Sequence, residues 1–201
     1  MGRTFFHPIP RAVFPLLTAF LLPVCSLLGG DLRVGGRAPD LNGIDIRSGE
    51  RTGLYRLMTD IFLERDQNGQ LVVGQNGKYR TVFRHNVLVL NFFSRHCIPC
   101  IREIPVYRRV AAKFKGRAVK MLYVNADGDL TQAGMKALAD KHTLTLPLLY
   151  AHQQEVMRTY RPRALPKLVV IGRDKKVAHI MTGFDENFET ALSNAIRSLL
   201  P

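Results

Sequence analysis

Residues 87–105, VLVLNFFSRHCIPCIREIP, place two of the chain's three cysteines three positions apart, with a proline between them. The first seven residues form an apolar run rich in valine and phenylalanine, which is typical of a strand covered on both faces. Residues 98–115 carry apolar side chains at helical spacing and predict a helix. The spacing of the cysteines leaves three interpretations open: a dithiol that cycles with a disulfide, half of a metal site, or two buried thiols that happen to be close.

The first cysteine, Cys97, falls between the predicted strand and the predicted helix. Unpaired backbone N–H groups and the positive end of the helix dipole favour the thiolate form of a cysteine at such a place. Cys100 follows one helical turn later and is within reach for a disulfide. Pro99 is tolerated because a first-turn proline leaves no hydrogen bond broken. The pattern therefore predicts Cys97 as the attacking thiolate and Cys100 as the resolving thiol.

The first thirty residues differ from the rest of the chain, because they contain no acidic residue and carry an apolar run from Ala12 to Val24. Such a run behind a basic start predicts a secretory signal, with an uncleaved membrane anchor as the alternative. Cys25, at the end of the run, is a candidate for lipid attachment. Residues 31–201 are long enough for one domain with a full core. We expect that domain to lie outside the cytoplasm, where a close cysteine pair forms a disulfide.

The remaining pattern predicts an α/β fold, a mixed central sheet with helices on both faces. Before residue 87 it predicts a helix at 52–64 and a hairpin around Asn76-Gly77. Asp127 and Asp129 are interpreted as turn residues at the end of a strand. After residue 115 the pattern predicts strands at 119–127, 166–172 and 177–183. It predicts helices at 131–142, 155–160 and 186–200.

The formal net charge is +13, which suits anionic lipid headgroups or acidic partners. Nucleic-acid binding is not expected, because the basic residues are scattered and no aromatic ladder or nucleic-acid motif accompanies them. A solvated basic surface is the simpler interpretation.

The quoted stretch resembles the active-site segment of the thioredoxin superfamily. Asn91, Glu103 and Pro105 make it similar to the TlpA/ResA-like branch of exported thiol-disulfide oxidoreductases, and RVGGRAPDL (33–41) resembles the entry segment of that branch. The resemblance implies a thioredoxin fold with Cys97 and Cys100 as the catalytic pair, and with neither a cofactor nor a resident metal.

The resemblance also places a cis-proline opposite the cysteines, at Pro166 in RALPKLVVI. There the backbone of Leu165 would pair with an extended substrate segment. The implied activity is reduction of disulfides in other exported proteins, with cytochrome c maturation as a candidate process and a membrane electron donor as the source of electrons. The sequence leaves the opposite direction, oxidation, open.

The sequence departs from the family pattern in three places. His96 stands where the family has tryptophan, Lys167 replaces threonine after the proline, and residues 42–86 are longer than the usual connection. A cationic imidazole at His96 would favour the thiolate and make the disulfide more oxidising, while an exposed loop histidine would do neither. We expect the additional residues to form an insertion at an edge of the fold.

Two further interpretations remain open. Glu103 is either a buried acid that accepts protons from Cys100, as the resemblance implies, or a helix-surface charge, and the residues slightly favour the surface role. Asn91 cannot titrate, although some relatives have a proton-transferring aspartate there. The rival function is copper binding, in which Cys97, Cys100 and a histidine such as His96, His152 or His179 hold Cu(I).

Overall fold

The computed structural model describes Gly2 and residues 32–201. The predicted leader and Cys25 lie outside the described residues. Within the described part, no helix is long and apolar enough to span a membrane.

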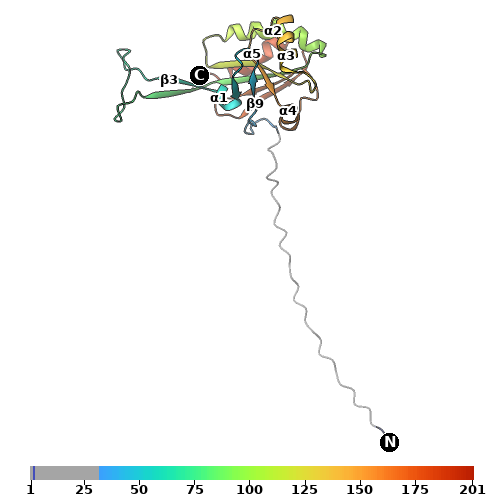
Figure 1. The fold of residues 1–201 in the computed structure, drawn as a ribbon, viewed down its shortest axis with the longest axis horizontal. Helices are drawn as coiled ribbons and strands as arrows, with labels where there is room; N and C mark the ends of the chain where they lie inside the picture. The colour runs from blue at the N-terminus through green and yellow to red at the C-terminus, as the bar shows by residue number, and fades with distance from the viewer. Residues whose placement is uncertain (1, 3–31) are drawn as a thin grey trace.

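A seven-stranded mixed sheet forms the centre of the molecule, in the order β2-β1-β7-β6-β5-β8-β9 (Figure 1). β5, β6 and β7 are parallel neighbours, while β8 pairs antiparallel with β5 and β9 antiparallel with β8. At the other edge, β1 pairs antiparallel with both β2 and β7. The strands are β1 Asn42–Asp45, β2 Arg51–Gly53, β5 Val87–Phe93, β6 Val119–Asn125, β7 Leu148–Ala151, β8 Lys167–Ile171 and β9 Val177–Thr182.

All seven residues of β5 are buried, as expected of the central strand of a sheet covered on both faces. Because alternate side chains of a strand point to opposite faces, Val89 packs in one core and Leu90 in the other. The first core is closed by α2, α3 and α5, and the second by α1 and α4. The helices are α1 Leu54–Leu57, α2 Ile98–Lys113, α3 Gln132–Lys141, α4 Gln153–Thr159 and α5 Phe188–Arg197.

The structure confirms the predicted α/β class and the elements from β5 onward, with boundaries that shift by a few residues. Thr131 caps α3 through a 3.1 Å hydrogen bond from the Gly134 N–H to its hydroxyl, which fixes the start of that helix. Pro105 lies inside α2, which continues through it. The strand β7, before α4, was not predicted.

The predicted helix at 52–64 is wrong. Only Leu54–Leu57 is helical, and Thr59–Leu63 forms a strand, β3, that pairs antiparallel with β4, Thr81–His85. Leu54 and Met58 are buried as the helical spacing predicts, but Ile61 is exposed. Pairing with β4 therefore decides the conformation of the second half of this segment.

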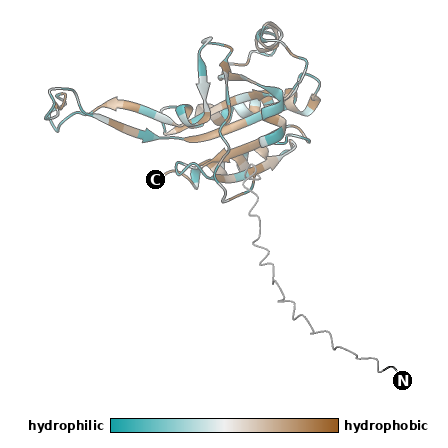
Figure 2. Ribbon diagram, turned by 60° about the horizontal axis from the view of Figure 1, so that its bottom comes forward, coloured by the Kyte–Doolittle hydropathy of each residue, from teal (hydrophilic) through white to brown (hydrophobic). Residues whose placement is uncertain are grey.

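β3 and β4 form a separate two-stranded arm that projects far from the body of the molecule, and its tip divides into two short hairpins (Figures 1 and 2). One hairpin carries the bridge between Arg65 and Leu71, and the other carries the bridge between Val73 and Tyr79. The hairpin predicted around Asn76-Gly77 is confirmed only in part. Val73 and Tyr79 do pair across this turn, but the following residues, Thr81–His85, pair with β3 instead. Residues 42–86 thus contain the edge pair β1–β2, the helix α1 and this arm.

Candidate active site

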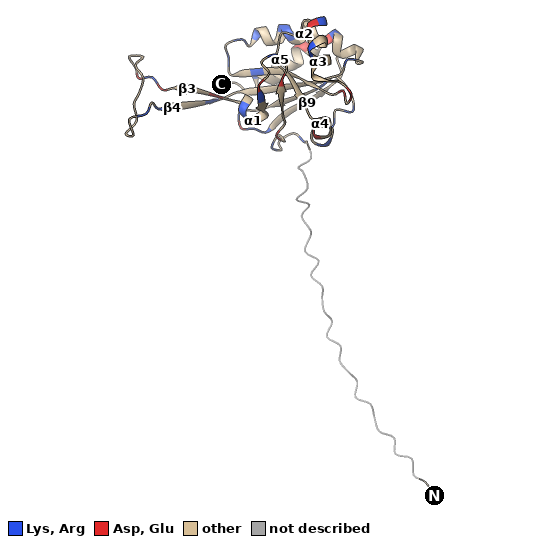
Figure 3. Cartoon of the chain, in the orientation of Figure 1, with Lys and Arg blue, Asp and Glu red and all other residues tan. Residues whose placement is uncertain are grey.

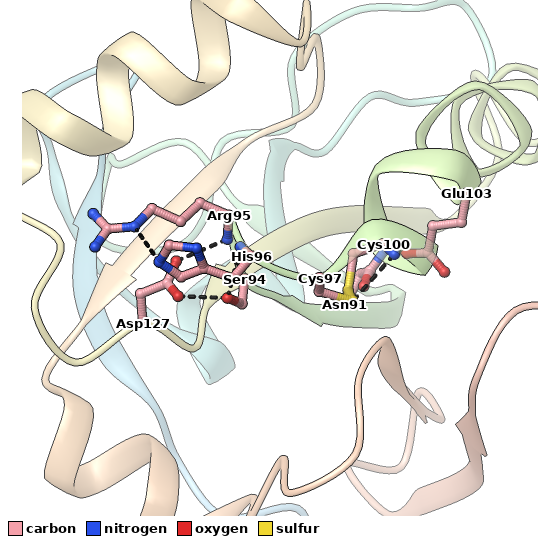
Figure 4. The surroundings of a disulfide bond; sticks show 8 residues. All are labelled: Asn91, Ser94, Arg95, His96, Cys97, Cys100, Glu103 and Asp127. Atoms are coloured by element: carbon pink, nitrogen blue, oxygen red, sulfur yellow. Dashed lines mark hydrogen bonds between the residues drawn. A yellow bond between two sulfur atoms is a disulfide. The ribbon is translucent and has the colours of Figure 1, made fainter.

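Cys97 and Cys100 are joined by a disulfide at the point where β5 leads into α2, with their Cα atoms 5.2 Å apart (Figure 4). Cys97 is the N-cap residue of α2, and its sulfur accepts a hydrogen bond from the Cys100 N–H at 3.2 Å. Pro99 lies in the first turn, as predicted. Cys97 is half-buried, whereas Cys100 is buried. An attacking sulfur that is accessible and a second sulfur that is sheltered are the arrangement that thiol-disulfide exchange requires.

A network anchored on Asp127 holds the loop that precedes Cys97. The carboxylate of Asp127 accepts hydrogen bonds from the Ser94 hydroxyl at 2.5 Å and from the Arg95 N–H at 2.9 Å. The Ser94 oxygen in turn accepts from the His96 N–H at 3.2 Å. Asp127 lies directly before the turn at Gly128 and Asp129, and its N–H donates to the side chain of Asn125 at 3.0 Å. Sequence reasoning missed its larger role, since nothing in the sequence shows that this turn faces Ser94.

The side chain of His96 is exposed and turns toward Arg95 (Figure 4). The Arg95 Nε donates a 2.9 Å hydrogen bond to the His96 Nε2. Arg95 also pairs with Asp129 at 2.6 Å. The imidazole is thus held by Arg95, and this arrangement favours the simple loop role over direct stabilisation of a thiolate.

Glu103 is buried in α2, so the slightly favoured surface role is wrong. Its Oε1 accepts a hydrogen bond from the Asn91 Nδ2, and both side chains lie beside Cys100 (Figure 4). Burial raises the pKa of Glu103 to about 8, although the hydrogen bond from Asn91 works in the opposite direction. The Oε2 of Glu103 and the Oδ1 of Asn91 are buried without a hydrogen-bond partner. A proton-carrying group thus lies next to the sheltered cysteine.

The peptide bond between Leu165 and Pro166 is cis, as the resemblance implied. Lys167 pairs with Phe92 across β8 and β5, which places the proline next to the end of the strand that leads to the cysteines. Leu165 is partly buried and packs against the core that contains Cys100. The Nζ of Lys167 donates to the Tyr160 carbonyl at 2.7 Å, so its charge is directed to the loop after α4. Burial lowers the pKa of Lys167.

The copper interpretation requires a third ligand near the two sulfurs. Among residues 32–201, no three His, Cys, Asp or Glu side chains are grouped so that they could hold a metal ion. His152 occupies the N-cap position of α4 without a side-chain capping bond, and His179 lies on β9 opposite Val170. Neither is gathered with the cysteines into such a group.

The sheet order, the disulfide at the start of α2 and the cis-proline beside it define a protein of the thioredoxin fold with a CxxC site. The sequence profile of the AhpC/TSA family matches residues 65–180, more than half of the chain. The chain therefore belongs to the AhpC/TSA family.

Curated relatives carry the name thiol-disulfide oxidoreductase ResA, which confirms the predicted similarity to ResA-like proteins. The protein from Geobacillus kaustophilus is 29% identical over 101 residues, which are 50% of this chain and 57% of that one. The chain thus spans less than two thirds of that relative's length. The protein from Bacillus anthracis is 26% identical over 140 residues, or 70% of this chain and 75% of that one.

Solved structures of low sequence identity share the fold. A Chlorobium tepidum protein assigned as a thiol:disulfide interchange protein DsbE aligns with a TM-score of 0.65 at 19% identity, over 85% of this chain and all of its own. The thioredoxin domain of a thiol-disulfide oxidoreductase from Bacteroides vulgatus aligns with a TM-score of 0.61 at 14% identity, over 83% and 99%. The predicted thioredoxin fold is confirmed.

Proposed function

We propose that this protein is an exported thiol-disulfide oxidoreductase that reduces disulfides in other exported proteins. The observation that carries the proposal is the disulfide between half-buried Cys97 and buried Cys100 at the start of α2. The ResA-type relatives support the same activity. Cys97, Cys100 and Pro166 are the proposed catalytic residues, with Leu165 presenting its backbone to the substrate.

The reaction begins with the reduced protein. The thiolate of Cys97 attacks one sulfur of the substrate disulfide, the substrate S–S bond breaks, and the other substrate sulfur leaves as a thiolate. Cys100 then loses its proton and attacks the sulfur of Cys97. The mixed disulfide breaks, the second substrate thiolate leaves, and the disulfide seen in this structure forms. Two electrons pass from the cysteine pair to the substrate, and the departing thiolates take up two protons.

Glu103 is the group that we assign to the proton of Cys100. It lies one helical turn beyond Cys100 and is sheltered from water, and its pKa of about 8 is close to ambient pH. A group with such a pKa can accept the proton in one direction of the reaction and return it in the other. Asn91, which donates to Glu103, positions the carboxyl and does not itself titrate.

Electron supply, location and substrate belong to the same proposal. A membrane electron donor returns the disulfide to the dithiol after each turnover, and apocytochromes c awaiting haem attachment are the proposed substrate class. The apolar run at residues 12–24 would direct export to a periplasmic or other extracytoplasmic space, either as a cleaved signal or as a tether.

The first experiment traps the mixed disulfide. In Cys100→Ser the resolving thiol is absent, so substrate proteins should remain covalently attached to Cys97 and be released by reducing agent. The matched control, Cys97→Ser, retains one thiol but should trap nothing, because Cys100 is buried. The proposal fails if Cys100→Ser traps no exported protein or if both variants trap equally.

A second measurement decides the direction of electron flow. The reduction potential of the Cys97–Cys100 pair should lie near ~−270 mV, the value of thioredoxin, if the protein is a reductant. A value near ~−120 mV, that of a strong oxidant, would overturn the proposed direction and leave the exchange chemistry intact.

A further inference from the structure

The arm formed by β3 and β4 has one face that is apolar and uncharged. Ile61 stands directly opposite Phe83 in the register, and Leu63 stands opposite Thr81. Because successive side chains of a strand alternate between faces, these four residues share one face of the ribbon. Ile61 is 64% exposed, Phe83 62% and Leu63 47%, so the face is uncovered.

The opposite face of the arm is charged. Asp60 and Arg84 form an ion pair at 3.0 Å, and the Arg84 guanidinium covers the ring of Phe62 at 4.8 Å from its centroid. Further out, Arg80 pairs with Glu64 at 3.0 Å. The ribbon is therefore amphipathic, with its charges on the face away from Ile61.

The arm also concentrates the exposed apolar side chains of the part of the molecule that the structure describes. Of the ten large apolar residues that are exposed in the described part of the chain, seven lie on it: Ile61, Phe62, Leu63, Val73, Tyr79, Val82 and Phe83. An apolar surface of this kind on an isolated projection marks a site of interaction with a partner or a membrane.

The base of the arm is fixed to the sheet end that lies farthest from the disulfide. The Asn86 N–H donates to the Met58 carbonyl at 2.7 Å where the arm leads into β5, while Cys97 follows the other end of β5. Asp60 accepts from the Lys120 Nζ at 2.6 Å, and the Arg173 Nε donates to the His85 carbonyl at 2.9 Å. The arm is thus braced from β6 and from the turn after β8, and it points away from the redox site.

Basic residues surround this end of the molecule (Figure 3). The arm at 59–85, the start of β6 at 117–120 and the turn at 173–176 together contain nine Lys or Arg against four Asp or Glu. In the part of the chain that the structure describes, no carboxylate pairs with Lys78, which lies on the hairpin at the tip. Anionic phosphate headgroups complement such a distribution.

We propose that the arm binds the surface of an anionic lipid bilayer, with Ile61, Leu63 and Phe83 inserted between the headgroups. The basic residues at the base and tip contact the phosphates. The combination of a small apolar face and surrounding cations is the one that interfacial membrane-binding elements use. Binding in this way turns the disulfide, at the far end of β5, away from the lipid and toward proteins in the aqueous space.

A second copy of the chain fits the arm less well. The three large apolar side chains on the uncharged face, Ile61, Leu63 and Phe83, offer about 300 Å² if each contributes ~100 Å², about half the area a large side chain buries. A stable protein interface needs about 800 Å² from each partner. Two arms packed face to face would also bring the surplus cations of both copies together, which opposes association.

The chain contains no tryptophan, so one substitution provides a clean fluorescent probe. In full-length Phe83→Trp, the emission should move to shorter wavelength with phosphatidylcholine–phosphatidylglycerol vesicles and should be quenched by brominated lipid. Met157→Trp is the matched control, because Met157 is exposed on α4 at the other end of the sheet. Its emission should not change. Both proteins retain residues 1–30, so binding through the leader alone would leave the Phe83→Trp emission unchanged and overturn the proposal.

Two further results complete the test. Binding to phosphatidylcholine vesicles alone should be several-fold weaker, and Lys78→Gln should weaken binding to the anionic vesicles. Equal binding to both vesicle types would refute the role of charge. If the emission of Phe83→Trp moves to shorter wavelength as the protein concentration rises without any lipid, the arm binds a second copy of the chain. That result would overturn the proposal of membrane binding. The proposed redox function is tested separately, because thiol exchange by Phe83→Trp in solution should equal that of wild type.

Discussion

Replacing Glu103 with glutamine should stabilise the protein at neutral pH while impairing its proposed activity. The folded-state pKa of about 8 is raised above the ordinary value of 4.5. A raised carboxyl pKa contributes stability that is fully present below pH 4.5 and is lost as the pH rises to 8, because in this range the unfolded chain releases the proton while the folded protein keeps the group neutral. A difference of one in pKa corresponds to about 1.4 kcal/mol, so roughly 3 kcal/mol is lost by pH 7 and roughly 4 kcal/mol by pH 8.

Glutamine has the shape of the protonated acid and cannot ionise, so Glu103→Gln should keep the stability that wild type loses. The amide can also donate to the Asn91 Oδ1, which has no hydrogen-bond partner in the structure. With an m-value of about 2 kcal/mol/M, the expected gain at pH 7 moves the urea midpoint upward by about 1–2 M. At pH 4.5 the two proteins should unfold at similar urea concentrations.

The assay is urea unfolding of the oxidised protein at pH 4.5, 6, 7 and 8, with the difference between variant and wild type as the measured quantity. Glu186→Gln, at an exposed glutamate, is the matched control and should follow wild type at every pH. If the difference between Glu103→Gln and wild type stays constant across this range, the carboxyl does not carry a raised pKa and its assignment to the proton of Cys100 loses its basis.

Three other predictions concern the surroundings of the site and the base of the arm. Asp127→Asn weakens the charge-assisted bond from Ser94, so it should cost about 1–3 kcal/mol in urea unfolding and slow thiol exchange; unchanged exchange would reduce the network to a structural role. His96→Ala should shift the reduction potential by less than ~30 mV, a tenfold change in equilibrium constant, and a larger shift would show that the imidazole acts on the cysteines. Burial raises the pKa of Asp60, but hydrogen bonds led by that from Lys120 lower it to about 2. The stability that the ionised Asp60 contributes is present above its ordinary pKa of 3.8 and is lost as the pH falls through 2. Asp60→Asn should therefore be about 1 kcal/mol less stable than wild type at pH 7 and equally stable at pH 2 in the same unfolding assay.

The sequence around the disulfide predicts its own structure well because the relevant interactions are local. A buried strand, a cap residue and a helix follow one another within the stretch 87–105, and the apolar pattern specifies each of them. The cis bond at Pro166 came from family resemblance, since an isolated X-Pro bond is cis in only ~5% of cases.

Glu103 shows where local reasoning fails. An acidic residue in a helix is usually exposed, so the local pattern favoured the surface role although the resemblance implied a buried acid. The contact with Asn91 from β5 shows that Glu103 faces the core. Asp127 is similar, because its contact with Ser94 joins the ends of two different strands.

The helix predicted at 52–64 is wrong for another reason. Its apolar residues have helical spacing, but the second half pairs with β4 and projects into solvent. No core lies against this half, so a helix there would bury no apolar face and strand pairing decides the conformation. β7 is only four residues long, and a partner of it, β1, lies about a hundred positions earlier in the chain. Neither pairing leaves a signal in a single short window of sequence.

The position of β1 between β2 and β7 has a consequence for the order in which the protein acquires its structure. Gly43 pairs with Ala151, so the edge of the sheet cannot close until the polypeptide has been made beyond residue 151. At a synthesis rate of about 5–20 residues per second, β1 waits roughly 5–20 s for its partner. During that interval the nascent chain offers open strand edges, and a chaperone that holds the early segment apart would favour the correct pairing.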